Sequence, residues 1–164
     1  MKKLNAAVDR FAYSHPHFGI PNLMKFIVIG NVIVYLLSLF AGYSAVSFLG
    51  FSWTAIKHFE IWRLVTFIFM PGYYSTGDLL WLALFLYFYY MIGTTLEREW
   101  GTAKFSLYYL SGVVLTLITG IVLGVVTGQD VWIAGTNYVN LSMFFAFAML
   151  YPDTQFLIMF IIPV

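Results

Sequence analysis

The chain contains no cysteine, few histidines and few charged side chains, and each shortage excludes a class of function. Without cysteine there can be no disulfide, no thiolate catalysis and no cysteine metal site. His15 and His17 are close enough in sequence to chelate a metal, but two ligands make a weak site, so neither a metal nor a cofactor is predicted. A net charge of +1 argues against nucleic acid, which usually binds clustered basic residues.

Apolar side chains take the place of the missing charge. The chain is 62% hydrophobic and 9% charged, whereas soluble domains are about half apolar and about a quarter charged. A soluble fold of 164 residues could not hide that much apolar surface. The composition therefore predicts an all-α, polytopic protein whose helices contact the lipid bilayer.

Four apolar runs have about the length that crosses a 30 Å hydrocarbon core as a helix. The predicted membrane domain covers residues 23–164, with spans at residues 23–41, 79–96, 105–127 and 131–151. A fifth run, residues 156–164, would cover only about 14 Å as a helix, so the sequence is expected to be truncated within a fifth span. Residues 1–22 are polar and predict a tail, with a short amphipathic helix near residues 6–13.

A cluster of charged residues separates the second and third spans. Glu97, Arg98, Glu99 and Lys104 lie close together, and an ionised side chain at mid-membrane costs about 2.5–3.5 kcal/mol even on insertion scales. We therefore expect the chain to return to water here. Gly101 permits a tight reversal.

Residues 42–78 form the long connection between the first two spans. Its apolar pieces are interrupted by polar residues, and residues 61–70 are too few to cross a membrane. Tryptophans and tyrosines in this segment suit the headgroup layer. We expect a structured outer loop that lies partly in the outer leaflet.

The basic residues predict the orientation. With the N-terminus in the cytoplasm, six of the eight basic residues lie on the cytoplasmic side and two, Lys57 and Arg63, lie outside. This distribution satisfies the positive-inside rule. In the third span, Gly120, Gly124 and Gly128 form a smooth ridge that predicts close packing within the bundle or, alternatively, a homo-oligomer through this face.

Four motifs, in this order, resemble the rhomboid family of intramembrane serine proteases. They are Glu60-Ile-Trp62-Arg63-Leu-Val-Thr66, Leu96-Glu97-Arg98, Gly101-Thr-Ala-Lys-Phe105 and the segment 135–152. The resemblance implies a rhomboid-like helical bundle. It also implies that Trp62 and Arg63 anchor the outer loop, and that Glu97, Gly101 and Phe105 fasten the second and third spans. A solvated charge at the interface is the alternative for Glu97. The five donors of Arg63 suit unpaired loop carbonyls.

The catalytic positions depart from the rhomboid pattern. The family's Gly-x-Ser-Gly reads Gly135-Thr136-Asn137-Tyr138 here, and the amide of Asn137 is not a nucleophile. Tyr138 is expected to crowd the site. The positions of the family's oxyanion-stabilising His-x-x-x-Asn read Trp81 and Phe85, and the general-base histidine is expected beyond residue 164. Thr136 and Ser142 offer hydroxyls, but no histidine is placed to activate them.

Asn137 and Asn140 lie three residues apart, on one helix face, in the outer half of the predicted bilayer. They either form hydrogen bonds between helices or line a hydrated cavity that holds a polar feature of a client helix, with Ser142 as a further binding candidate. Asn31, in the first span, is interpreted as an interhelical hydrogen-bonding residue.

Three functions follow as hypotheses. The first is a rhomboid-like pseudoprotease that binds, holds or moves other transmembrane helices. The second is an intramembrane serine protease with an unrecognised nucleophile. The third is a transporter or channel subunit for a neutral solute, because the spans contain no ionisable group at mid-membrane of the kind that charged solutes require.

Overall fold

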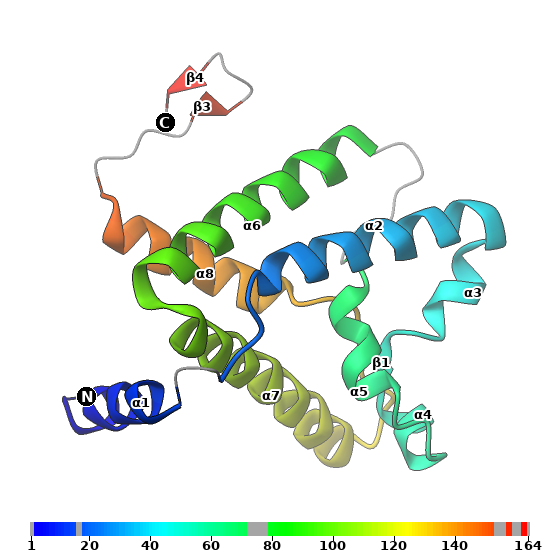
Figure 1. The fold of residues 1–164 in the computed structure, drawn as a ribbon. Helices are drawn as coiled ribbons and strands as arrows, with labels where there is room; N and C mark the ends of the chain where they lie inside the picture. Colours follow the sequence, from blue (N-terminus) through cyan, green and yellow to red (C-terminus); the bar gives the residue numbers. More distant parts are fainter. Residues whose placement is uncertain (1, 16–17, 72–78, 153–156, 159–161, 164) are drawn as a thin grey trace.

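The computed structural model describes residues 2–15, 18–71, 79–152, 157–158 and 162–163. Within these residues, three helices are long and apolar enough to cross a membrane: α2 (Leu23–Ala41), α6 (Leu79–Trp100) and α7 (Thr102–Thr127). A fourth apolar helix, α8 (Asn137–Leu150), is shorter. In Figure 1, α2 and α6 run side by side, and α8 packs against both α6 and α7. The chain is a helical membrane protein with several spans, as the composition predicts.

The first three spans follow the apolar runs. α2 has the same bounds as the predicted span. α6 and α7 extend into the predicted return segment, because the residues of that segment continue both helices and leave only Gly101 between them. Glu and Arg are good helix formers, so the charges do not end α6. Gly101 does, with a φ of +84° that an L side chain rarely adopts.

The fourth span differs from its prediction. Residues 131–136 are not helical, since β2 (Trp132–Ile133) pairs antiparallel with β1 (Phe51–Ser52) of the outer loop. Gly135 then turns with a φ of +71° and donates its N–H to the carbonyl of Phe67 at 3.0 Å. Helix α8 therefore begins at Asn137, and its 14 residues cover about 21 Å, less than a full crossing.

The expected start of a fifth helical span is also corrected where the structure describes it. β3 (Leu157–Ile158) and β4 (Ile162–Pro163) pair as short antiparallel strands. Residues 156, 159–161 and 164 lie outside the described residues. A helix of about nine residues is too short to be stable without packing partners, because its first turn is costly to form.

The N-terminal segment and the outer loop form short helices around the bundle. The N-terminal segment forms α1 (Lys2–Ser14), whose partner is the beginning of α7. The outer loop contains, in order, α3 (Tyr43–Ser47), β1, α4 (Trp53–Lys57), α5 (Arg63–Thr66) and the 3₁₀ helix η1 (Phe67–Phe69). Residues 72–78 of the predicted loop lie outside the described residues.

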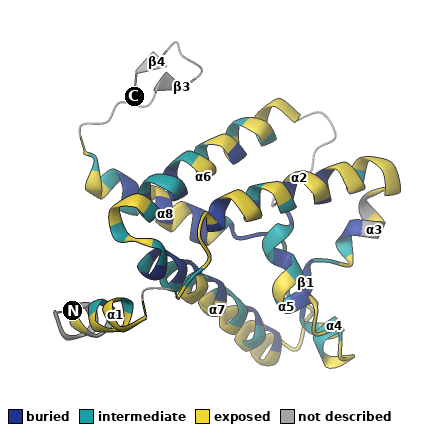
Figure 2. Cartoon of the chain, in the orientation of Figure 1, coloured by how far each residue is buried: buried dark blue, intermediate teal, exposed yellow. Residues whose placement is uncertain are grey.

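The core lies where α2, α6, α7 and α8 meet the outer loop. Phe51 of the loop, Phe67 and Phe105 are fully buried there. The outward faces of the long helices are exposed and apolar, with side chains such as Leu36, Leu115 and Val126 (Figure 2). Contiguous exposed apolar surface marks contact with a membrane.

Candidate functional site

A cavity of about 480 Å³ opens between α2, α6 and the beginning of α8. Its size is within the range of pockets that bind ligands. Met70 and Pro71 line the end that faces the outer loop. The remaining lining residues are Met24, Ile27, Val28, Asn31, Tyr35, Trp81, Leu82, Phe85, Leu86, Tyr89, Thr136, Asn137 and Asn140.

Three carboxamides are among the lining residues of the cavity. Asn137 and Asn140 come from the first turn of α8, and Asn31 comes from near the middle of α2. Asn31 and Asn140 are 7% and 9% exposed. The Nδ2 of Asn31 donates to the carbonyl of Ile27 at 2.8 Å, whereas the Oδ1 of Asn140 is buried without a hydrogen-bond partner. An unpaired buried acceptor costs about 1–3 kcal/mol, so this amide is a candidate for binding.

A row of aromatic side chains from α6 also lines the cavity. Trp81, Phe85 and Tyr89 follow one another at intervals of four residues, which places them on one helix face. The Phe85 and Tyr89 rings are stacked with centroids 6.3 Å apart, and the Trp81 ring lies 6.4 Å from that of Phe85. The lining of the cavity thus combines three carboxamides with a row of aromatic rings.

Two contacts fix the helices that bound the cavity. The hydroxyls of Tyr109 on α7 and Thr136, the residue before α8, share a buried hydrogen bond of 2.8 Å. Gly93 lets α6 approach α2, because a Cβ at this position would collide with the side chain of Met24. The sequence analysis did not identify Tyr109 or Gly93 in these roles.

The structure places the predicted α8 residues on different faces. Asn137 and Asn140 line the cavity, as the functional hypothesis requires. Ser142 does not; its hydroxyl lies 2.6 Å from that of Tyr108 and donates to the carbonyl of Val139. Tyr138 is 78% exposed and points away from the bundle, so the predicted crowding is wrong.

Asn31 has a different role from the one predicted. Its described hydrogen bond is to its own helix, four residues back, so it is not a bond between helices. Its position near the middle of a span indicates that it has a role, since a carboxamide at mid-membrane must be paired or hydrated. Only the structure shows that it shares a cavity with the α8 amides.

Glu97 joins three elements on the side of the bundle where α6 ends. Its Oε1 accepts the N–H of Asn22, just before α2, at 2.9 Å and the hydroxyl of Thr102, at the start of α7, at 3.0 Å. Phe105 is fully buried in the core. Gly101 acts through its backbone conformation rather than by a close helix approach, because a Cβ built there meets nothing within 4 Å.

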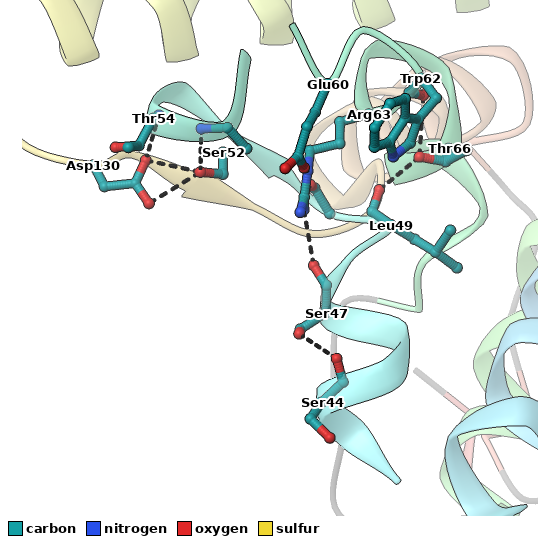
Figure 3. A network of polar contacts seen from close by, with 12 residues as sticks. Ser44, Ser47, Leu49, Ser52, Thr54, Glu60, Trp62, Arg63, Thr66 and Asp130 are labelled. Atoms are coloured by element: carbon teal, nitrogen blue, oxygen red, sulfur yellow. Dashed lines mark hydrogen bonds and ion pairs between the residues drawn. The ribbon is translucent and has the colours of Figure 1, made fainter. Parts of the chain in front are cut away.

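Arg63 ties the outer loop together (Figure 3). Its Nη1 donates to the carbonyls of Ser47 at 3.1 Å and Gly50 at 2.8 Å, and its Nε pairs with Glu60. The five N–H donors of Arg63 led us to expect such bonds to carbonyl groups of the loop. Trp62 is half exposed, and its ring lies 5.3 Å from that of Phe48.

Asp130, which the sequence analysis did not identify, links the outer loop to the α7–α8 connection (Figure 3). Its carboxylate accepts the hydroxyl of Ser52 at 3.0 Å and the N–H of Thr54 at 2.9 Å. Burial raises the pKa of Asp130, but the hydrogen bonds from Thr54 and Ser52 outweigh burial and hold the pKa below its ordinary value.

The glycine ridge of α7 is covered by the chain's own loop. A Cβ at Gly120 would lie 2.7 Å from the Phe51 ring, and one at Gly124 would collide with Trp53. Gly128 ends α7 with a φ of +67° and meets nothing. A second copy could reach Gly124 only by displacing Trp53.

The described residues contain no group of three His, Asp or Glu side chains that could hold a metal. His15 is exposed after α1, and His58 is exposed after α4. Neither lines the cavity. His17, the other half of the weak predicted pair, lies outside the described residues.

A family model described as eukaryotic integral membrane protein (DUF1751) matches residues 25–163, which is most of the chain. The match includes α6, α8 and all of α2 except its first two residues. No curated protein and no solved structure matches the chain.

Proposed function

The chain belongs to the eukaryotic integral membrane protein family DUF1751, and on that premise we propose that it is a non-catalytic, rhomboid-like protein that binds, holds or moves other transmembrane helices. The observation that carries this proposal is the cavity between α2, α6 and α8, because one of its lining residues, Asn140, has a buried amide oxygen without a hydrogen-bond partner. Polar groups at membrane depth are expensive unless a partner satisfies them. A client helix can supply that partner.

The position of the cavity supports the rhomboid-like part of the proposal. Asn137 stands where the resemblance puts the nucleophile, and Trp81 and Phe85 stand where it puts the oxyanion donors. These residues come from two different helices and line the same cavity. A cavity at the position of the rhomboid site is what the resemblance implies.

The chemistry of the cavity supports binding rather than proteolysis. Serine-type cleavage requires a hydroxyl nucleophile, a base within hydrogen-bond reach and donors for the oxyanion. Thr136 is the one aliphatic hydroxyl among the described lining residues, and its oxygen bonds to the phenol of Tyr109. A phenol with a proton is not a general base at neutral pH.

We also propose that the N-terminus is cytoplasmic. Lys104 of α7 pairs with Asp9 of α1 at 2.7 Å, so α1 lies at the same end of the molecule as the beginning of α7. Single cysteines at Ser14 and His58, both exposed, test the orientation in this chain without natural cysteine. An impermeant thiol reagent outside the cell should label the residue at 58 and not that at 14. The reverse pattern would overturn the orientation.

Photo-cross-linking tests the binding function. The photoreactive amino acid p-benzoylphenylalanine is placed at Phe85, in the cavity, or at Val122, which is exposed on the outer face of α7. The full chain is reconstituted in phosphatidylcholine vesicles with a series of single-span peptides, both wholly apolar and with one central polar residue. At least one peptide should cross-link from position 85 and only at background from position 122. Equal yields from both positions for every peptide would contradict the proposal.

A further inference from the structure

Asn140 lines the cavity and carries a buried acceptor that no described residue satisfies. Its side chain is 9% exposed, and its Oδ1 is buried without a hydrogen-bond partner. The backbone N–H of Asn140 is already used, since it donates to the carbonyl of Thr136 at 2.8 Å. An acceptor left unpaired in an apolar interior is unfavourable. An occupant that donates a hydrogen bond to Asn140 therefore gains affinity.

We infer that the site selects client helices that carry a neutral hydroxyl or carboxamide side chain, Ser, Thr, Asn or Gln, near the middle of the membrane. This inference rests on the proposed function and names the chemistry that the client must present. A hydroxyl or carboxamide can both donate and accept, so it satisfies the Asn140 amide in either orientation of that amide. An apolar client would leave the amide unpaired.

The residues that line the cavity favour a neutral polar group on the client helix over a charged one. The described residues of the cavity include no Asp, Glu, Lys, Arg or His. A charged client side chain would therefore enter an apolar site without a counter-ion, which is strongly unfavourable. The aromatic row of Trp81, Phe85 and Tyr89 offers apolar contact to the neighbouring side chains on the same face of the client helix.

The depth of the amides favours a helix over a lipid as the occupant. Asn31 lies near the middle of α2 and lines the same cavity as Asn140. The hydroxyls of bilayer lipids lie at the headgroup level, about 15 Å from the centre of a 30 Å core. A side chain of a membrane-spanning helix can instead lie at any depth.

The test compares peptides that differ only at their centre. A single-span Leu/Ala helix with Leu, Ser, Asn or Lys at the central position carries a fluorescence acceptor, and the full chain in phosphatidylcholine vesicles carries the donor. Energy transfer at low peptide density gives the association constant, and vesicles without protein give the correction for peptide self-association. The Ser and Asn peptides should bind about 3-fold to 30-fold more tightly than the Leu peptide, the range for one hydrogen bond between helices. The Lys peptide should bind no better than the Leu peptide.

Variants assign the preference to Asn140. Asn140→Leu should reduce the ratio of Ser-peptide or Asn-peptide binding to Leu-peptide binding to about one, whereas Asn140→Ser, which keeps a hydroxyl, should retain a preference for the polar peptides. Thr119→Val removes a hydroxyl from the lipid-exposed face of α7 and serves as the matched control. A preference that survives Asn140→Leu would overturn the assignment.

Peptide binding by the natural chain also tests the inference, even if a variant fails to fold. Equal binding of the Leu, Ser and Asn peptides would overturn the inference and leave the proposed function intact. Absence of binding by every peptide would overturn both. Displacement of the polar peptide by diacylglycerol but not by a lipid without a hydroxyl would show that a lipid is the occupant, which also overturns the inference.

Discussion

Tyr109 and Thr136 share a buried hydrogen bond of 2.8 Å between their hydroxyl oxygens. Tyr109 belongs to α7, and Thr136 is the last residue before α8. The bond therefore fixes the start of α8 against α7, and with it the positions of Asn137 and Asn140 in the cavity wall. The geometry of the candidate site therefore depends on a contact in which one partner, Tyr109, lies outside the predicted motifs.

Removal of this hydroxyl should destabilise the bundle. Tyr109→Phe leaves the Thr136 hydroxyl buried without its partner, at a cost of about 1–3 kcal/mol in the free energy of unfolding. Tyr108→Phe is the matched control, because its bond to Ser142 is exposed and should contribute at most about 0.5–1.5 kcal/mol. Denaturation in detergent, followed by circular dichroism, measures both. Equal losses for the two variants would show that the buried bond has no special role.

Loss of the Arg63 side chain should loosen the outer loop and leave the membrane-spanning helices folded. Arg63→Ala leaves the carbonyls of Ser47 and Gly50 and the carboxylate of Glu60 without their donor, at about 1–3 kcal/mol. Limited proteolysis in detergent should cleave the loop faster while the helix content stays unchanged. Arg63→Lys should rescue little, because a single ammonium cannot reproduce the fork of donors. Lys57→Ala is the control, since Lys57 is an exposed basic residue of the same loop whose ammonium lies over the Trp53 ring. Unchanged cleavage of the Arg63→Ala variant would refute the anchoring role.

Acid should loosen the contact between Asp130 and the outer loop. The folded-state pKa of this carboxyl is below its ordinary value of 3.8, so the stabilisation is present above pH 3.8 and is lost as the pH falls through the lower folded value. A nitroxide spin label on Lys57→Cys should become more mobile over that range. In Asp130→Asn the label should be mobile already at neutral pH and show no acid step. A label whose mobility is independent of pH in the natural background would contradict the prediction.

The cavity should have no proteolytic activity. Neither the natural chain nor its Asn137→Ser variant should react with fluorophosphonate probes or cleave a transmembrane substrate, because a serine there would have no base among the described lining residues. An active rhomboid serves as the positive control. Labelling of the natural chain at a serine or threonine within the membrane would contradict the non-catalytic function. Labelling of the Asn137→Ser variant alone would reveal a base and donors not recognised here.

The sequence predicts what depends on local composition. The bounds of α2 follow from an uninterrupted apolar run, and the reversal at Gly101 follows from a glycine among charges. The start of α8 could not be predicted in the same way. Val131 and Ile133 are apolar whether they form a strand or a helix, and what decides between the two is pairing with β1, far away in the sequence.

The same limit applies to the candidate site. Spacing on one helix face correctly groups Asn137 with Asn140, but it cannot show that Asn31 joins them from another helix. Asp130 looks like an ordinary turn residue because its partners, Ser52 and Thr54, lie on a distant segment. Tyr138 was misinterpreted because the direction of a side chain around a helix depends on the exact residue at which that helix begins.

Filling the cavity with a large side chain tests directly whether client helices bind there. Val28 lines it from α2, and Val28→Trp places a large ring in the space that a client helix would occupy. Val122→Trp puts the same ring on the exposed face of α7 and is the control. Binding of a single-span peptide with a central asparagine is measured by energy transfer in vesicles, after circular dichroism shows that both variants are folded. If client helices are held in this cavity, Val28→Trp should abolish binding and Val122→Trp should retain it. Undiminished binding by the folded Val28→Trp variant would show that client helices are not held there.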